Sequence, residues 1–285
     1  MNVRQHFLCK DLKALEQVLS GIELGRCVFR GQSDVSFQLQ TSLARQFSKL
    51  DNQALLFKGE EILKKFEQEV VVKQLSEHIY TDSFRFQKES FKNRWLFMAQ
   101  AQHYGIPTRL MDWTTRWEIA IYFASVDSKC NENKAGQLWV LDKTDLINNP
   151  DSVLSDALYK QDTLTFDDTV LFQVATEDRS QQKLSFKRIY QQDGRFLVLP
   201  VSDLKTPLEE RKEFRDRLTL LKIAPLCKME MKESLGKRMD IPFFLENING
   251  IKLKNGSYEK IYDDVYFYGN MDDKLKKVVD TIRQS

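Results

Sequence analysis

The amino-acid sequence predicts an α+β protein that folds as a single compact domain. Segments with helical spacing and segments with strand character are interleaved irregularly along the chain. The 285 residues, of which 42% are hydrophobic, are enough to bury a sizeable core. No internal repeat, low-complexity tract or clean linker divides the chain.

The first third of the chain predicts two helices and a strand. Residues 10–20 have helical spacing and end at Gly21. Residues 26–31, RCVFRG, predict a short buried strand whose end exposes Arg30. Residues 59–79 predict a long amphipathic helix, because their apolar side chains recur on one face.

The densest part of the sequence joins two further predicted helices by a short turn. The first of these helices covers residues 89–104 and is stopped by Gly105. The second begins after Thr114, where Thr115 and Glu118 fit the S/T-x-x-E capping box.

The second half of the chain predicts strands around a long insertion. GQLWVLD at 136–142 and LTLLKIA at 218–224 predict strands. Residues 143–180 are acidic, polar and weakly periodic, and predict a long insertion that could hold one helix. Residues 187–201 predict a β-hairpin around Asp193-Gly194. The remaining segments, predicted as helices and loops, are residues 228–239, 262–269 and 270–284.

Charge and cysteine content exclude several classes of protein. Lys plus Arg total 43 and Asp plus Glu total 41, so the net charge of +2 does not favour bulk capture of nucleic acid. The four cysteines and three histidines are scattered, which argues against a metal site and a disulfide framework. Residues 1–19 have no apolar signal-peptide core, and no run is apolar enough to cross a bilayer. We therefore expect a cytoplasmic protein with no membrane partner.

The common catalytic fingerprints are absent. The sequence contains no GxxxxGK[ST], GxGxxG, GxSxG or HExxH motif. The candidate functional residues therefore come from three less familiar segments.

The first of these segments is the predicted turn, AQHYGIPTRLMDWTTRWE. The N-terminus of the helix that follows it would suit an anion such as a phosphate, and Arg109 would add charge-assisted hydrogen bonds. Trp113 or Tyr104 could stack on a base or a nicotinamide-like ring. The structural alternative is a buried Arg109–Asp112 pair that fastens the turn. The polar and aromatic candidates here are Gln102, His103, Tyr104, Thr108, Arg109, Asp112, Trp113 and Thr114.

The second segment is VFRGQSD at 28–34 and the third is RIYQQDGRF at 188–196. In the second, Gly31 would let a ligand approach the backbone closely beside the Arg30 guanidinium, with Gln32 next to it. The structural alternative is an arginine paired with an acid at the sheet rim. In the third, Gln192 could orient a ligand through its amide, although an ordinary exposed hairpin is the simpler interpretation.

Together the three segments resemble the FRG domain, which is named for its Phe-Arg-Gly motif. That motif is Phe29, Arg30 and Gly31 here, and AQHYGIPTRLMDWT is similar to the family pattern AQHYGxPTRLLDWT. The resemblance runs from about residue 22 to about residue 240, so we expect an FRG domain over residues 1–246. Residues 247–285 are expected to be an extension packed on the same domain. The family occurs in bacteria and phages, and its activity is poorly defined.

A weaker resemblance links the chain to ADP-ribosyltransferases. Those enzymes have a strand whose arginine grips the phosphates of NAD, then a Ser-Thr-Ser-like strand followed by a helix of the form A-x-x-F-A. Arg30 matches the first element, and DWTTRWEIAIYFA is similar to the second, with Thr114 at the Ser/Thr position. The resemblance implies a split β-sheet core with flanking helices, and NAD as the cofactor.

The resemblance also implies roles for individual residues. Arg30, with Gly31 and Gln32, would hold the pyrophosphate; His103 would bond the ribose or nicotinamide side, with Thr108 and Arg109 beside it. Tyr104 or Trp113 would stack on the ring, Thr114 would position ribose, and Gln192 would face a protein or nucleic-acid acceptor. The usual Glu-x-Glu is replaced by Gln191 and Gln192, so another acid such as Asp112 or Glu118 would take over, or the site would bind without turnover.

The sequence thus leaves three functional hypotheses. The first is an NAD-binding transferase or glycohydrolase, which would suit a bacterial toxin or phage-defence effector by analogy with the family. The second is a non-catalytic nucleotide or nucleic-acid recognition module. The third is an interaction protein whose motifs are purely structural.

Overall fold

The computed structural model describes residues 6–68, 94–103, 105–125, 133–144, 162–173, 193–238 and 280–281. Its helices and mixed sheet confirm the α+β class. The chain divides into two compact units of interleaved segments. Unit 1 draws on Met1–Leu39, Trp113–Leu146 and Pro207–Ser257, and unit 2 on Gln40–Asp112, Ile147–Thr206 and Tyr258–Ser285.

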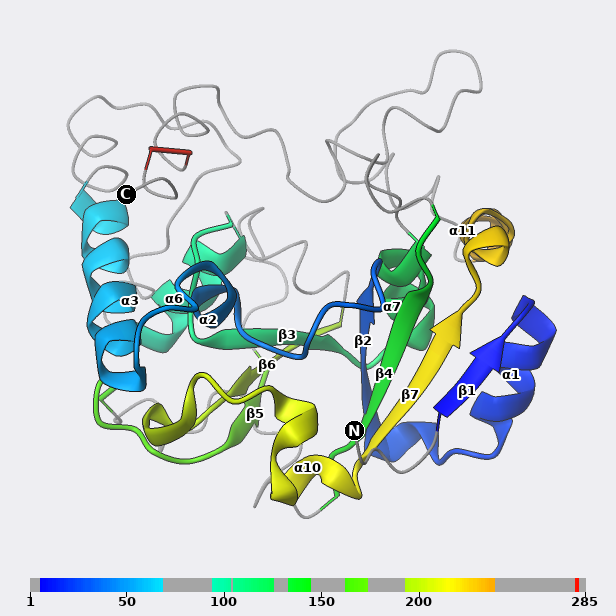
Figure 1. Ribbon diagram of the computed structural model, residues 1–285, viewed down its shortest axis with the longest axis horizontal. Helices are drawn as coiled ribbons and strands as arrows, with labels where there is room; N and C mark the ends of the chain where they lie inside the picture. Colours follow the sequence, from blue (N-terminus) through cyan, green and yellow to red (C-terminus); the bar gives the residue numbers. More distant parts are fainter. Residues whose placement is uncertain are drawn as a thin grey trace, which may run out of the picture. The chain divides into compact units, whose positions relative to one another are not determined.

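Unit 1 contains a mixed sheet in the order β1-β7-β4-β2 (Figure 1). Its strands are β1 (His6–Cys9), β2 (Cys27–Gln32), β4 (Gly136–Asp142) and β7 (Leu218–Ile223). β1 runs parallel to β7, whereas β7, β4 and β2 pair antiparallel. On the other side of β2, Phe29 pairs with Thr114, the last residue of β3 (Leu110–Thr114).

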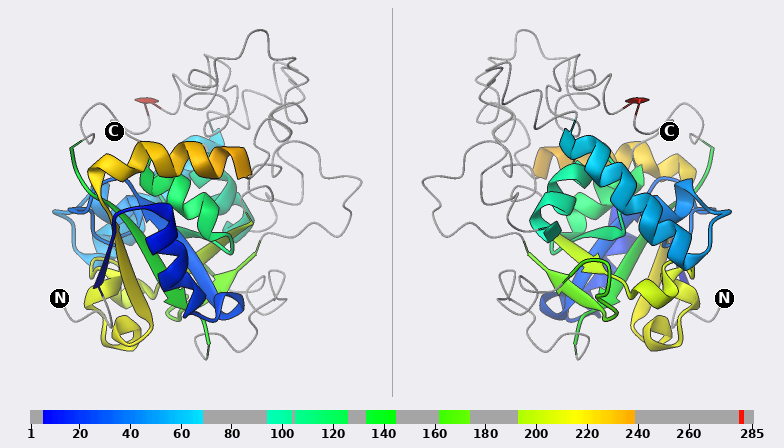
Figure 2. Two further views of the ribbon diagram at one scale, coloured as in Figure 1. Left: turned by 90° about the vertical axis from the view of Figure 1, so that its right-hand side faces the viewer. Right: turned by 90° about the vertical axis from the view of Figure 1, so that its left-hand side faces the viewer.

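Three helices bury one face of this sheet. They are α1 (Leu12–Ser20), α7 (Trp117–Ser125) and α11 (Lys228–Arg238). Figure 1 shows α1 next to β1 and α7 next to β2, and in Figure 2 α11 lies across α7. The core between the layers combines Leu15 and Leu19 of α1 with Ala120 and Ala124 of α7 and alternate strand residues. Alternation puts every second strand residue on this face.

Unit 2 is built on α3 (Asn52–Phe66), α6 (Arg94–His103) and the antiparallel pair β5 (Val170–Phe172) and β6 (Gly194–Val198). Phe66 of α3 packs on Phe97 of α6 with ring centroids 6.0 Å apart. Unit 2 also contains the short helical segments α2 (Ser42–Gln46) and η4 (Val201–Asp203), and unit 1 contains η1 (Leu24–Arg26), η5 (Leu208–Glu210), α10 (Lys212–Arg215) and η6 (Pro225–Cys227).

Local signals explain most element boundaries. The Asp11 carboxylate accepts the Ala14 N–H at 2.6 Å and begins α1, and Gly21 ends it as predicted. Asp51 caps α3 in the same way, so this helix begins at Asn52, seven residues before the predicted start at Gly59. Gly105, with φ of 81°, follows α6 and stops it as predicted.

Two parts of the sequence prediction were wrong. Residues 110–114, expected in a turn, form β3, and helix α7 begins at Trp117 rather than at a Thr115–Glu118 capping box. The insertion predicted for 143–180 contains strand β5. The first arm of the predicted hairpin, and residues 247–279 and 282–285 of the expected C-terminal extension, lie outside the described residues.

Candidate functional site

Strand β2 presents the FRG motif to the two faces of the unit 1 sheet alternately. Phe29 belongs to the core beneath α7, and Gly31 touches that helix. Arg30 and Gln32 therefore lie on the opposite face. The two halves of the motif consequently meet different surroundings.

Gly31 lets α7 pack closely against the sheet, because it has no side chain. A Cβ atom at this position would lie 1.7 Å from the Ala120 carbonyl oxygen and 2.7 Å from the Ala124 nitrogen. Both are backbone atoms of α7, so a side chain on residue 31 would collide with the helix itself. The close approach that the glycine permits is thus to a helix, and not to a ligand as predicted.

Gln32 is buried and engaged with the protein on the opposite face. Its Oε1 accepts the Trp139 Nε1–H at 3.2 Å and a Gln137 Nε2–H at 3.1 Å. Its Nε2 donates to the Gln38 carbonyl at 3.2 Å. Two of these bonds hold β2 to β4 and the third holds the loop at Gln38, so Gln32 has a structural role.

The loop after the motif is fixed by two lysines. Asp34 is 1% exposed and forms an ion pair with Lys134, with 2.5 Å between Nζ and Oδ2. Its other carboxylate oxygen accepts hydrogen bonds from the Ser36 N–H and hydroxyl. Burial alone would raise the pKa of Asp34, but these hydrogen bonds outweigh it and lower the pKa to about 2. The fully buried Lys228 of α11 donates to the Ser33 carbonyl at 2.7 Å.

These loop contacts were missed by the sequence analysis. The Ser33-Asp34 pair was part of the quoted motif, but its partners Lys134 and Lys228 lie about 100 and 195 residues further along the chain. No local pattern marks either lysine as a partner of this loop. Ser33 and Asp34 therefore hold the backbone of the loop that follows Arg30 in place.

Arg30 is half-buried and is the residue of the motif best suited to bind an anion. In the β-ladders it pairs with Trp139 of β4, and the Phe29–Thr114 pairing places Trp113 of β3 next to it on the other side. Because Arg30 is half-buried between two tryptophan positions of the ladder, it is partly shielded from water, which strengthens its hydrogen bonds to a carboxylate or phosphate.

Trp113 itself is 3% exposed, so its ring is not open to stacking by a ligand in this conformation. Its indole N–H has no hydrogen-bond acceptor in the described part of the chain, which is unusual for a buried donor. Thr114 is also buried, and its hydroxyl oxygen accepts the Arg116 N–H at 3.1 Å. Thr114 therefore shapes the turn from β3 into α7.

In unit 2, the predicted turn is held together by Thr108 and Arg109. The Thr108 hydroxyl donates to Gln102 and accepts the Leu110 N–H at 3.1 Å, and the Thr108 N–H donates to Ser42. Because all these partners are protein groups, Thr108 has a structural role in this conformation.

Arg109 fastens three distant pieces of backbone. Its guanidinium donates to the carbonyls of Thr163 at 2.6 Å, Phe166 at 3.0 Å and Leu199, and lies 5.5 Å from the centre of the Trp95 ring. Burial lowers the pKa of Arg109 to about 10, against the opposing effect of Asp167 and Glu60, so it stays charged at neutral pH. Arg109 therefore has a structural role, as the alternative expected, but its described partners are backbone carbonyls rather than the predicted Asp112, which is exposed.

The remaining predicted site residues belong to the stretches of sequence assigned to unit 2. Asp112 is exposed on β3 and belongs to unit 2. His103 ends α6, and its side chain, like all of Tyr104, Gln191 and Gln192, lies outside the described residues. Five of the predicted site residues belong to unit 1: Arg30, Gly31, Gln32, Trp113 and Thr114.

Metal and thiol chemistry gain no support from the described side chains. They contain no group of three or more His, Cys, Asp or Glu residues that could hold a metal ion. Cys9, Cys27 and Cys227 are unpaired thiols, and burial raises the pKa of both Cys9 and Cys27 to about 11. Cys130 lies outside the described residues. No described helix is both long and apolar enough to span a membrane.

Comparison with known proteins identifies the segment around β2, β3 and α7. Residues 25–133 match the family model of the FRG domain. The match covers both the FRG motif and the AQHYGIPTRLMDWT segment, and confirms the resemblance inferred from them. No curated protein and no solved structure matches the chain.

Proposed function

Since residues 25–133 belong to the FRG domain family, we propose that the chain is an NAD-binding enzyme similar to ADP-ribosyltransferases. The observation that carries the proposal is an arrangement within unit 1. Strand β2 holds Arg30, the neighbouring strand β3 ends at Thr114, and the chain then turns directly into α7, whose Ala120 and Ala124 lie against Gly31. This order of elements is what the resemblance to ADP-ribosyltransferases implies.

Arg30 is assigned to the NAD pyrophosphate, because it is charged and half-buried on a rigid strand. Thr114 is assigned a positioning role at the ribose, through the turn that it holds. The burial of Trp113 makes Tyr104 the residue assigned to the nicotinamide ring. His103 remains assigned to the ribose or nicotinamide side.

The proposed reaction breaks the bond between ribose C1′ and the nicotinamide nitrogen. The bonding electrons leave with nicotinamide, and C1′ forms a new bond to water or to an acceptor nucleophile, which loses a proton. Gln192, as a neutral amide, would orient that acceptor but would stabilise the developing positive charge only weakly. Asp112, exposed on β3, is the candidate acid.

The test is nicotinamide release from NAD by the purified chain and by Arg30→Ala and Arg26→Ala variants, with and without cell extract. Arg26 is the matched control, because it is an exposed arginine just before β2 whose partner is Glu23. Losing a charge-assisted contact to phosphate should reduce release by Arg30→Ala about tenfold or more, with Arg26→Ala unchanged. Equal release by parent and Arg30→Ala, with both folded by circular dichroism, would contradict the assignment.

The Gln191-Gln192 pair favours a second candidate function, a nucleotide or nucleic-acid recognition module without turnover. It predicts that a nucleotide raises the melting temperature while no nicotinamide appears. Salt dependence separates the two ligands. Affinity for nucleic acid through many phosphate contacts falls steeply with salt, whereas affinity for one nucleotide falls little.

A further inference from the structure

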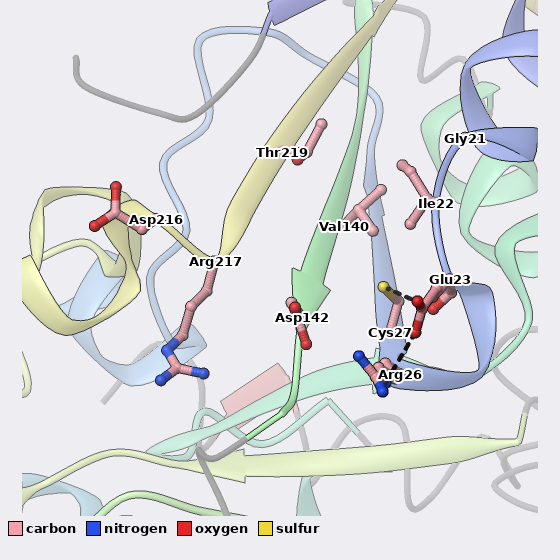
Figure 3. A pocket seen from close by; sticks show the side chains of 10 residues that line it. All are labelled: Gly21, Ile22, Glu23, Arg26, Cys27, Val140, Asp142, Asp216, Arg217 and Thr219. Carbon is pink, nitrogen blue, oxygen red and sulfur yellow. Dashed lines mark hydrogen bonds and ion pairs between the residues drawn. The ribbon is translucent and has the colours of Figure 1, made fainter.

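Unit 1 contains a pocket of about 390 Å³ at one end of its sheet (Figure 3). Helix α1 ends at Ser20, and the residues that follow it, Gly21, Ile22 and Glu23, line the pocket beside the strands. The strand residues that line the pocket are cross-strand neighbours: the buried Cys27 pairs with the half-buried Asp142, and the buried Val140 pairs with the half-buried Thr219. These four side chains share the face of the sheet that α1 covers, and Arg30 lies on the other face.

The floor of the pocket favours a positive group. Asp142 is half-buried; one carboxylate oxygen accepts the Thr144 N–H at 2.9 Å, and no described residue forms an ion pair with it. Thr219, on the neighbouring strand, is half-buried and lines the same pocket with its hydroxyl-bearing side chain. Gly21 at the end of α1 lines the same pocket, so the negative end of the helix dipole lies beside it.

Arg217, at one side of the same pocket, could bind a negatively charged group of a ligand. Arg217 donates one guanidinium N–H to the Thr144 carbonyl, which orients it and leaves further N–H donors. Arg26, on the other side of Asp142 in Figure 3, is committed to Glu23 at 2.9 Å and is 63% exposed. Such an exposed pair contributes little to recognition, so Arg217 is the anion-binding group.

Between these charges the wall is apolar. Ile22, Val140 and Cys27 line it, and burial keeps the Cys27 thiol protonated and uncharged by raising its pKa to about 11. The volume falls within the range of small-molecule sites. A ligand that matches the pocket therefore carries an ammonium group, an anionic group and a short aliphatic part.

We propose that this pocket binds a small zwitterion, an α-amino acid with a short aliphatic side chain. Its ammonium group contacts Asp142 and Thr219, its carboxylate contacts Arg217, and its side chain lies on Ile22 and Val140. The site is separate from the proposed nucleotide site, and stands whether or not the chain cleaves NAD.

The test uses L-leucine and two analogues that each lack one charge, 4-methylpentanoate and 3-methylbutylamine. Titration calorimetry and thermal unfolding of the full chain should detect binding of leucine and a rise in melting temperature. Each analogue should bind at least about tenfold more weakly, because each leaves one charged partner without its counterpart.

The matched variants are Asp142→Asn and Arg217→Gln, with Asp162→Asn as a control in unit 2. An asparagine keeps an oxygen for the Thr144 N–H but removes the charge, so Asp142→Asn should fold and weaken leucine binding about tenfold or more. Leucine binding that is absent in the parent, equalled by either analogue, or unchanged in both folded pocket variants would overturn the proposal.

Discussion

Replacing Gly31 by alanine tests whether the glycine of the FRG motif is needed for packing. The added Cβ would lie 1.7 Å from the Ala120 carbonyl oxygen, and ordinary contacts begin at 3.4 Å. Helix α7 and strand β2 would have to separate by up to about 1.7 Å, the difference between these two distances. Strand β2 cannot shift easily to relieve the clash, because it is paired with β4 on one side and with β3 on the other.

The cost follows from the core that this separation would open. Phe29, Ala120 and Ala124 are all 0% exposed at the contact. Overpacking a core costs about 1–3 kcal/mol, and here the clash is with backbone atoms that no rotamer change can relieve. We expect the free energy of unfolding to fall by about 3 kcal/mol or more, which is a large part of the roughly 5–15 kcal/mol of a typical domain.

The assay is urea denaturation followed by circular dichroism, with Gly25→Ala as the matched control. A Cβ on Gly25 would meet nothing within 4 Å, so that variant should unfold at or slightly above the parent midpoint. Since unfolding free energy falls by about 1–3 kcal/mol per molar urea, Gly31→Ala should lose about 1 M or more in midpoint. Equal midpoints for the two variants would refute the packing argument and restore a ligand role for Gly31.

Three further predictions concern buried charged groups. Arg109→Lys should lower the free energy of unfolding by about 2–4 kcal/mol, because one ammonium cannot replace three carbonyl contacts; an unchanged urea midpoint would contradict this. The lowered pKa of Asp34 means that its ion pair with Lys134 stabilises the fold above about pH 4 and is lost towards pH 2. Asp34→Asn should therefore melt below the parent at pH 6, with a difference that shrinks by pH 2.5. Burial raises the pKa of Glu209. The contribution of this residue to the stability of the fold is therefore fully present below its ordinary pKa of 4.5 and is lost as the pH rises. The Glu209→Gln variant keeps an acceptor for the Leu39 N–H. Its melting temperature should be higher than that of the parent at pH 7 and equal to it at pH 4. A lower melting temperature at pH 7 would count against this reasoning.

Much of the fold could be predicted because its signals are local. Gly21 and Gly105 end helices as expected, and the strands over 27–32, 136–142 and 218–223 match their apolar runs. Strand β3 was missed because its polar and aromatic residues suggest a turn, and its strand character depends on pairing with β2. Such pairing is set by residues far apart in sequence.

The sequence by itself determined the α+β class, most helix ends and the FRG resemblance, because caps, periodicity and motifs act over a few residues. Only the tertiary structure decided which polar residues face protein groups. Gln32 meets Trp139 across 107 positions, and Arg109 meets the Leu199 carbonyl across 90. A buried polar group must find a hydrogen-bond partner wherever the fold offers one, and that choice depends on burial and long-range contacts rather than on neighbouring residues.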